Sequence, residues 1–242
     1  STDGSWHSVL EGKTRGRLMQ LDGAAQEVVR SDGRTECVGG KTISGLGNVR
    51  VAATRKFDAQ KLSNWYSVAK TGDSRVAGRP VEVITLSPRD QHRYGFELYL
   101  DSETGVTLKS LLLNDKGQLL ERFQFTTFDP AAPDESQLQP TGRCLSAVAS
   151  NTSAPAPKSS EEWHSDWLPS GFELVASAVT RDPQTKSEVT NLLYDDGLTR
   201  FSVFLEPLLG ASVPDSRLQL GPTVAVSRLL SCPVGGVVAF VV

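Results

Sequence analysis

Alternating apolar and polar positions divide the middle of the chain into four short runs separated by turn residues. The runs are Val81–Leu86, Arg93–Leu100, Val106–Leu113 and Leu119–Thr127. In the second run, alternation places Tyr94, Phe96, Leu98 and Leu100 on one face, which is the two-residue period of a β-strand. The segments between the runs carry the Gly, Pro, Asn or Asp that a reversing backbone needs. The pattern therefore predicts an antiparallel meander over residues 79–128.

Four further β-like runs precede the meander, at the spacing between turns that is typical of an all-β fold. They are Trp6–Leu10, Arg15–Asp22, Gln26–Arg30 and Arg34–Val38. The weak pattern of Gly45–Thr54 indicates a loop. We therefore expect the N-terminal half to be mainly β, with the meander as its centre.

One short helix is predicted just before the meander, over Asp58–Trp65. Asp58 is a good N-cap residue, and Leu62, Trp65 and Tyr66 follow at helical spacing. After it we expect an extended segment, a turn at Thr71-Gly72-Asp73 and a second short extended segment up to residue 77.

Composition divides the chain after the meander. Residues 149–160 read ASNTSAPAPKSS, which is typical of a linker. We therefore expect an N-terminal domain over residues 1–145, a linker over 146–160 and a smaller C-terminal domain over 161–242. Strand-like runs in the last part are Phe172–Val179, Glu188–Tyr194, Thr199–Glu206, Pro222–Leu230 and Val234–Val242. A short helical turn is expected over Val213–Gln219. The final run lacks a polar end, so we expect it to form an exposed apolar edge.

Composition and charge argue against several classes of protein. The chain has 242 residues and a net charge of −3, and its Lys and Arg residues are scattered among acids rather than gathered in a basic stripe. This argues against nucleic-acid binding. No apolar run approaches the roughly 18–20 residues of a membrane span. No signal peptide opens the sequence, and its abrupt beginning leads us to expect the natural start upstream.

Candidate chemistry is sparse. His7, His92 and His164 lie far apart and form no metal-binding pair, and neither a GxSxG motif nor a Gly-rich phosphate loop is present. We therefore expect no catalytic site, no cofactor and no metal. The cysteines number three, so they cannot all pair internally, and none lies in a CxxC motif.

The meander is apolar on both of its predicted faces. Leu98, Leu108 and Leu112 are assigned to one face with Leu100, Phe123 and Phe125, whereas Leu111, Leu113 and Leu120 are assigned to the other. Such a sheet either packs on both sides in an ordinary core or uses one face to line a cavity for an acyl chain. The pattern leaves both readings open.

Several long blocks resemble one known family. These are RLMQLDGAAQEVVRSDGRTECV, RDQHRYGFELYLDSETG, LLLNDKGQLLERFQF, WHSDWLPSGFELV, DGLTRFSVFLEPL and QLGPTVAVSRL. Together they resemble the MucB/RseB family, and within it the MucB branch. The likeness runs from about Ser1 to Leu230, which is nearly the whole chain.

The resemblance implies a mainly β protein with an N-terminal half-open antiparallel β-barrel-like domain, similar to LolA and LolB. It also implies a smaller antiparallel C-terminal domain with a helix. The implied role is periplasmic: binding the periplasmic region of a MucA/RseA-type anti-sigma factor, protecting it from site-1 proteolysis, and release by lipopolysaccharide or a related lipid during envelope stress, as in alginate regulation. No enzyme activity, cofactor or nucleic acid is implied. A periplasmic lipid or lipoprotein carrier is the alternative, and a homo-oligomer is left open.

The resemblance also suggests sites. The expected lipid-facing residues are Phe96, Leu98, Leu100, Leu111, Leu113, Phe123 and Phe125. In a periplasmic protein, a Cys37–Cys144 disulfide becomes a hypothesis. The chain departs from the family at both ends, where an N-terminal part is missing and Ser231–Val242 replaces the family's last strand and basic tail. We therefore expect the end of the C-terminal domain to be altered.

Overall fold

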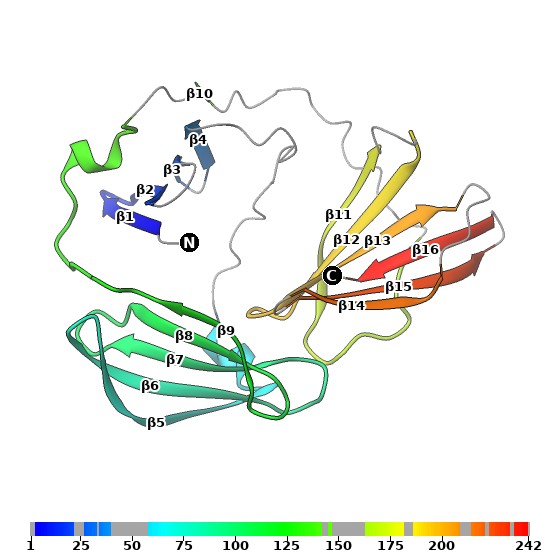
Figure 1. Cartoon of the computed structure of the whole chain (residues 1–242), viewed down its shortest axis with the longest axis horizontal. Coiled ribbons are helices and arrows are strands. Elements are labelled where there is room, and N and C mark those ends of the chain that lie inside the picture. The colour runs from blue at the N-terminus through cyan, green and yellow to red at the C-terminus, as the bar shows by residue number, and fades with distance from the viewer. Residues whose placement is uncertain are drawn as a thin grey trace. The chain divides into compact units, whose positions relative to one another are not determined.

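The computed structural model describes residues 3–21, 27–32, 34–39, 58–141, 145–146, 163–181, 186–208, 214–220, 223–232 and 235–241. These residues form three antiparallel sheets, which confirms the mainly β prediction (Figure 1). Within them each sheet is open, and the strand at either end is paired along one side only. The chain forms two compact units, one of residues 1–54 and 129–156 and the other of residues 55–128 and 157–242. The boundaries at 145 and 160 stay a prediction.

The sheet of the first unit has the order β1-β2-β3-β4-β10. Its strands are β1 (Asp3–Leu10), β2 (Lys13–Gln20), β3 (Glu27–Ser31), β4 (Arg34–Gly39) and β10 (Leu145–Ser146). β1 and β2 join through Glu11 and Gly12, whose φ angles of 51° and 78° are those of a tight hairpin turn. The four predicted N-terminal strands are confirmed, and the loop predicted over Gly45–Thr54 lies outside the described residues.

A buried ion pair fastens the 3-10 helix η1 (Glu135–Leu138) to this sheet. Arg17 on β2 donates to the Glu27 carboxylate on β3 and to the Gln137 carbonyl at 3.0 Å. The backbone N–H and hydroxyl of Thr141 also donate to Glu27. Burial raises the pKa of Glu27, but the hydrogen bonds from Arg17 and Thr141 outweigh burial and leave that pKa below its ordinary value.

The four predicted strands of the meander form β6 to β9 of a second sheet, in sequence order, and β5 joins them beside β6 as a fifth strand that was not predicted as part of the meander. Its strands are β5 (Tyr66–Val76), β6 (Arg79–Pro88), β7 (Gly95–Asp101), β8 (Thr107–Leu113) and β9 (Leu119–Gln124). The helix before it, α1 (Ala59–Leu62), is shorter than predicted but has the predicted cap. The Asp58 carboxylate accepts the backbone N–H groups of Gln60 and Lys61 at 3.0 and 3.1 Å.

The turn predicted at Thr71-Gly72-Asp73 is wrong. β5 continues through this segment with a β-bulge between Lys70 and Gly72. A glycine inside a strand pattern can mark a bulge as well as a turn, and local sequence does not separate the two. The chain reverses instead at Ala77 and Gly78, whose φ angles are 49° and 78°.

A second bulge corrects the assignment of Leu108. The pairing of β7 with β8 shifts between Tyr99 and Leu100, so that one residue of β8 has no direct partner. Leu108 is fully buried and packs with Val76 and Val81, with Tyr99 beside them. It therefore does not share the cluster of Leu98, as simple alternation predicted, because a bulge changes which face the following side chains occupy.

The third sheet contains the C-terminal strands in the order β11-β12-β13-β16-β15-β14 (Figure 1). They are β11 (Glu173–Arg181), β12 (Glu188–Asp195), β13 (Arg200–Pro207), β14 (Ser216–Leu220), β15 (Thr223–Cys232) and β16 (Gly235–Val241). Phe172, Leu192, Tyr194 and Leu205 form its buried core. The helical turn expected over Val213–Gln219 is wrong, since residues 216–220 form β14. The helix implied for this part is not found among its described residues.

The last strand is central, so the expectation of an exposed C-terminal edge is wrong. β16 pairs with β13 from Val203↔Val241 to Pro207↔Val237 and with β15 along its other side. The local sequence predicted an apolar strand over the last residues, but it did not predict whether that strand lies at the centre or at the edge of the sheet. A strand with partners on both sides is more easily apolar than an edge strand, whose unpaired groups invite association.

Arg93 joins the meander to the C-terminal sheet within the second unit. Its fully buried guanidinium donates to Asp196 at 2.7 Å, to Asp90 at 2.8 and 3.1 Å, and to the Ser170 carbonyl at 2.5 Å. It also lies over the rings of Tyr66 and Phe172. One side chain therefore links the turn before β7, the segment before β11 and the β12–β13 hairpin.

Close packing surrounds this ion pair. Trp65 donates its indole N–H to the Asp196 carbonyl at 3.3 Å, and Leu198 packs on the Leu62–Tyr66–Leu86 core. Gly171 has a φ of 88°, and a Cβ there would come within 2.4 Å of the Trp65 ring. Any side chain at this position would push the two elements apart.

We predict that Arg93→Met destabilises the second unit by about 3–5 kcal/mol, because it leaves the buried Asp196 carboxylate without its cationic partner. Urea unfolding monitored by tryptophan fluorescence measures this loss. Arg122→Met is the control, because Arg122 is exposed on β9 and should change the free energy of unfolding by less than about 0.5 kcal/mol. Equal stability of Arg93→Met and wild type would contradict the role of this contact.

Asp101 predicts a pH dependence of stability. Arg79 donates two hydrogen bonds to its carboxylate at 2.6 and 2.9 Å, and these, with those from Thr104, hold the Asp101 pKa well below its usual range. A carboxylate whose pKa is lower in the folded state stabilises the protein above its unfolded pKa of about 3.9 and loses that contribution as pH falls. The stability difference between wild type and Asp101→Asn should therefore be constant above about pH 5 and shrink below pH 4. A difference that stays constant down to pH 2 in urea titrations would be the contrary result.

Candidate functional site

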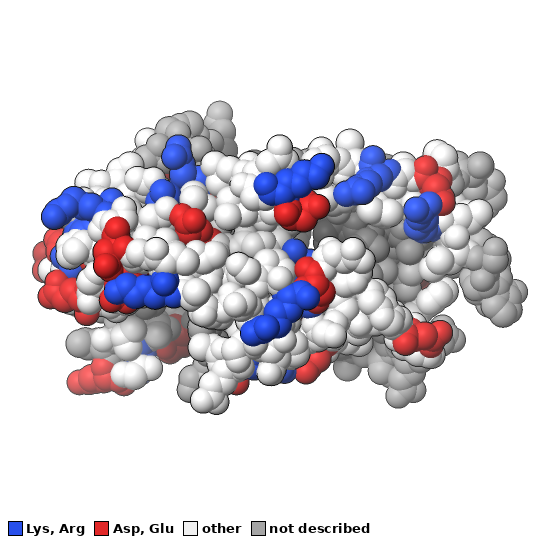
Figure 2. All heavy atoms as spheres, turned by 90° about the horizontal axis from the view of Figure 1, so that it is seen from below, with Lys and Arg blue, Asp and Glu red and all other residues white. Residues whose placement is uncertain are grey.

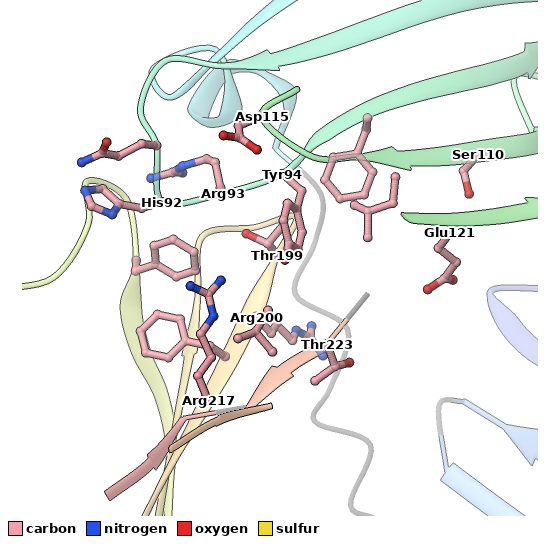
Figure 3. Close-up of a pocket in the computed structure, with 16 residues that line it drawn as sticks. His92, Arg93, Tyr94, Ser110, Asp115, Glu121, Thr199, Arg200, Arg217 and Thr223 are labelled. Carbon is pink, nitrogen blue, oxygen red and sulfur yellow. The ribbon is translucent and has the colours of Figure 1, made fainter. Parts of the chain in front are cut away.

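A pocket of about 900 Å³ lies in the second unit, lined by both the meander and the C-terminal sheet (Figure 3). The meander side supplies Gln91, His92, Arg93, Tyr94, Phe96, Ser110, Leu112, Asp115 and Glu121. The C-terminal side supplies Phe172, Thr199, Arg200, Phe201, Arg217, Thr223 and Val224. Its volume falls in the range of ligand-binding pockets.

Strand register explains why the meander residues meet. Phe96 on β7 lies opposite Leu112 on β8, and Leu112 lies opposite Glu121 on β9. Residues paired in this way share one face of an antiparallel sheet. The three side chains therefore form a row across three strands, apolar at β7 and β8 and acidic at the edge strand.

Aromatic rings line the C-terminal side. Phe201 stacks on Tyr194 with ring centroids 4.9 Å apart, and its centroid lies 5.0 Å from that of Phe172. His92 on the meander side contacts Trp167 edge to face at 5.2 Å. Trp167 is 63% exposed, which is unusual for so large an aromatic side chain. The pocket thus combines an apolar lining with an exposed tryptophan beside one of its lining residues.

The charges of the pocket are distributed unequally. Arg93 is neutralised by Asp90 and Asp196, and Arg200 donates to Asp195. Arg217 makes no ion pair with any residue that the structure describes, and the same holds for Asp115 and Glu121. Figure 3 shows Arg217 on the opposite side of the pocket from the two carboxylates. One wall therefore offers a cation and the other offers anions.

The predicted lipid-facing residues do not share one surface. Phe96 lines the pocket, and Leu98 packs with it against the Leu62–Tyr66–Leu86 core. Leu111 lies opposite Glu97 on the other face, with Leu113 two residues further along the strand. The remaining three are a partly buried Leu100, a half-exposed Phe123 and a Phe125 that packs near Leu108. A lipid contact for these seven stays a prediction.

Sequence reasoning missed the charged pocket residues. Asp115 reads as part of a turn, Glu121 as the polar position of a strand, and Arg217 as one of many scattered cations. They lie up to about 100 positions apart, so no local motif joins them. The sequence offered one signal for this site, which is the row of Phe96 and Leu112 on neighbouring strands that ends at the acidic Glu121.

Cys37 is disulfide-bonded. The short strand β10 pairs with β4 through Leu145↔Val38 and Ser146↔Cys37, so the chain just after residue 144 runs beside Cys37. Cys144 lies outside the described residues, and the Cys37–Cys144 pairing stays a prediction. Among the described residues, no cluster of His, Cys, Asp and Glu is suited to a metal ion.

The described helices are too short or too polar to cross a membrane. On the face drawn in Figure 2, basic and acidic residues are interspersed, and no large area of one sign is visible. This face therefore offers local charged groups rather than one broad charged patch.

Comparison with known proteins identifies the family. The model of the MucB/RseB N-terminal domain matches residues 2–142, and that of the MucB/RseB C-terminal domain matches residues 157–238. The sigma factor AlgU regulatory protein MucB of Pseudomonas aeruginosa is 53% identical over all of this chain and 76% of its own length.

Solved structures agree with this match. The complex structure of P. aeruginosa MucA/MucB has a TM-score of 0.87 and 51% identity over 99% of this chain and 81% of that chain. A crystal structure of MucB in complex with MucA(peri) has a TM-score of 0.84 and 50% identity over 99% of this chain and 80% of that chain. With both domains matched and a MucB that is 53% identical over the full length of this chain, the chain belongs to the MucB/RseB family, in its MucB branch.

Proposed function

We propose that this protein is a periplasmic regulator that binds the periplasmic region of a MucA/RseA-type anti-sigma factor. The observation that carries the proposal is the similarity to MucB structures solved with MucA, at TM-scores of 0.84 and 0.87 over 99% of the chain. The lining of the pocket also supports a binding role, because it combines rings and free charges rather than an activated nucleophile. The protein acts by binding and not by catalysis.

Protection of the anti-sigma factor follows from occupancy. A segment held against this protein cannot enter the active site of the site-1 protease, so cleavage requires prior dissociation. The fraction of the anti-sigma segment that remains free equals 1/(1 + c/Kd), where c is the concentration of free regulator. This fraction falls as the regulator concentration rises above Kd. Release by lipopolysaccharide or a related lipid requires that lipid and anti-sigma factor favour different states of the protein, and the coupling is reciprocal.

The proposal predicts saturable binding of the MucA periplasmic region to the full chain without lipid, measured by isothermal titration calorimetry. Cleavage of that region by the site-1 protease should slow as the chain is added, and added lipopolysaccharide should restore cleavage and weaken binding. Lack of binding without lipid would remove the regulatory role. Lipid binding alone would then favour a periplasmic lipid or lipoprotein carrier.

The two faces of the meander offer different surfaces to a lipid. Leu111 lies between Glu97 and Arg122 on the neighbouring strands. On the other face, Phe123 belongs to a surface that also carries Phe96 and Leu98. That face also carries Ser110, opposite Phe123, and Glu121, but an acyl chain gains more from its several apolar side chains than from one leucine between charges. We therefore propose that the lipid contacts the face that carries Phe123.

We accordingly predict that Phe123→Glu weakens binding of lipopolysaccharide by roughly tenfold, the effect of about 1.4 kcal/mol. Phe123 is 50% exposed, so the fold should tolerate this change. Leu111→Glu, on the opposite face of the neighbouring strand, is the matched control. Fluorescence titration with labelled lipopolysaccharide distinguishes the faces, and a loss confined to Leu111→Glu would place the lipid on the other side of the sheet.

A further inference from the structure

The single methionine of the chain lies in a polar contact rather than in an apolar core. Met19 is on β2, and its sulfur accepts a hydrogen bond from the Arg17 guanidinium at 3.3 Å and a weaker one from the Thr141 hydroxyl at 4.0 Å. Among the described residues, the buried apolar clusters do not include Met19. Methionine more often fills gaps between apolar side chains, so a sulfur that faces two donors calls for another explanation.

The same two donors fasten η1 and the residues after it to the first sheet. Arg17 donates to the Gln137 carbonyl at 3.0 Å and to the Thr141 hydroxyl at 3.4 Å. Thr141 donates its backbone N–H and its hydroxyl to the Glu27 carboxylate, each at 3.1 Å. Met19 lies directly opposite Glu27 in the pairing of β2 with β3. The sulfur therefore shares its donors with the contacts that hold this segment.

The sulfur of Met19 is accessible to a small oxidant. Met19 is partly exposed, whereas Arg17, two residues earlier on the same strand, is only 5% exposed. A peroxide can therefore reach the sulfur while the sheet stays folded. The sulfur attacks one peroxide oxygen, so that an S–O bond forms and the O–O bond breaks. Sulfur loses two electrons, the peroxide gains them, and the proton of the transferred oxygen leaves with the other oxygen as water.

A sulfoxide at Met19 would compete for the donors on which the docked segment depends. Its oxygen is a stronger acceptor than a thioether sulfur, and a hydrogen bond from a guanidinium to it is charge-assisted. A stronger Arg17–Met19 bond joins two residues of one strand, and it draws the guanidinium away from the Gln137 carbonyl. The Thr141 hydroxyl has one proton, so it cannot donate to the sulfoxide and to Glu27 at once. Each of these changes weakens the docking of the segment.

We propose that Met19 is an oxidation site, at which conversion to the sulfoxide by a peroxide releases residues 135–141 from the first sheet. These residues lie on the path from β9 of the meander to β10 of the first sheet. They belong to the first unit, which the chain re-enters at residue 129. Oxidation therefore loosens the first unit close to this re-entry. The inference goes beyond the proposed binding function and does not depend on it.

Peroxide treatment of the full chain tests this site. Peptide mass spectrometry should show one added oxygen on the peptide that contains Met19. Hydrogen exchange of the peptide that covers residues 135–141 should then become roughly tenfold faster, because its contacts to the sheet open more often. Methionine sulfoxide reductase should reverse both changes.

Two variants of Met19 isolate the effect of the sulfur. Met19→Leu is the matched control, since leucine keeps an apolar side chain of similar size without the sulfur. This variant retains every Cys and Trp of the chain, and its hydrogen exchange should stay at the untreated level after peroxide. Met19→Gln introduces a strong acceptor oxygen on a side chain of similar length, and it should speed the exchange without any oxidant.

Three results would overturn the proposal. The first is the absence of Met19 oxidation at peroxide concentrations that oxidise free methionine. The second is an unchanged exchange rate once Met19 is oxidised. The third is an equal acceleration in the Met19→Leu chain, which would place the responsible oxidation at another residue. None of these measurements uses the anti-sigma factor, so a failure here leaves the proposed function untouched.

Discussion

The second unit depends on one buried cation. Arg93 lies where the meander, the segment before β11 and the β12–β13 hairpin meet, and its guanidinium satisfies acceptors from all three. Removing a charge from water is costly unless hydrogen bonds compensate for it, and four hydrogen bonds join the Arg93 guanidinium to carboxylate or carbonyl oxygens. Because Arg93 also lines the pocket, the contact that joins the two sheets is part of the binding surface that they share.

This arrangement suits a protein that works by binding. A pocket built from two sheets changes shape whenever the contact between those sheets changes, so that ligand binding and sheet contact are linked. The pocket takes Arg217 from one sheet and Glu121 from the other, so an occupant that contacts both sheets favours the state in which they are joined. A ligand shifts this contact only by the difference between its affinities for the two states, so opposed effects of two ligands require opposed preferences.

The C-terminal sheet shows a similar dependence between distant parts of the chain. β16 joins two groups of strands, β11-β12-β13 and β15-β14, by pairing along both of its sides. Among the described strands, no strand of one group pairs with a strand of the other, and β16 alone lies between β13 and β15. The seven residues of β16 therefore decide whether the six strands form a single sheet.

The sequence by itself determined the strands, the N-cap at Asp58, most of the turns and the family, because alternation, capping and turn chemistry act over a few residues. It could not place the bulges beside Gly72 and Leu108, since one glycine is compatible with a turn or a bulge and one inserted residue changes the face of its neighbours. Only the tertiary structure decided that β16 is central, that Arg93 pairs with Asp196, and that Arg217 lines the same pocket as Asp115 and Glu121. Each of these contacts joins residues that are far apart in the chain. The free energy that stabilises the contacts comes from burial and charge pairing, which a pattern over a few neighbouring residues does not predict.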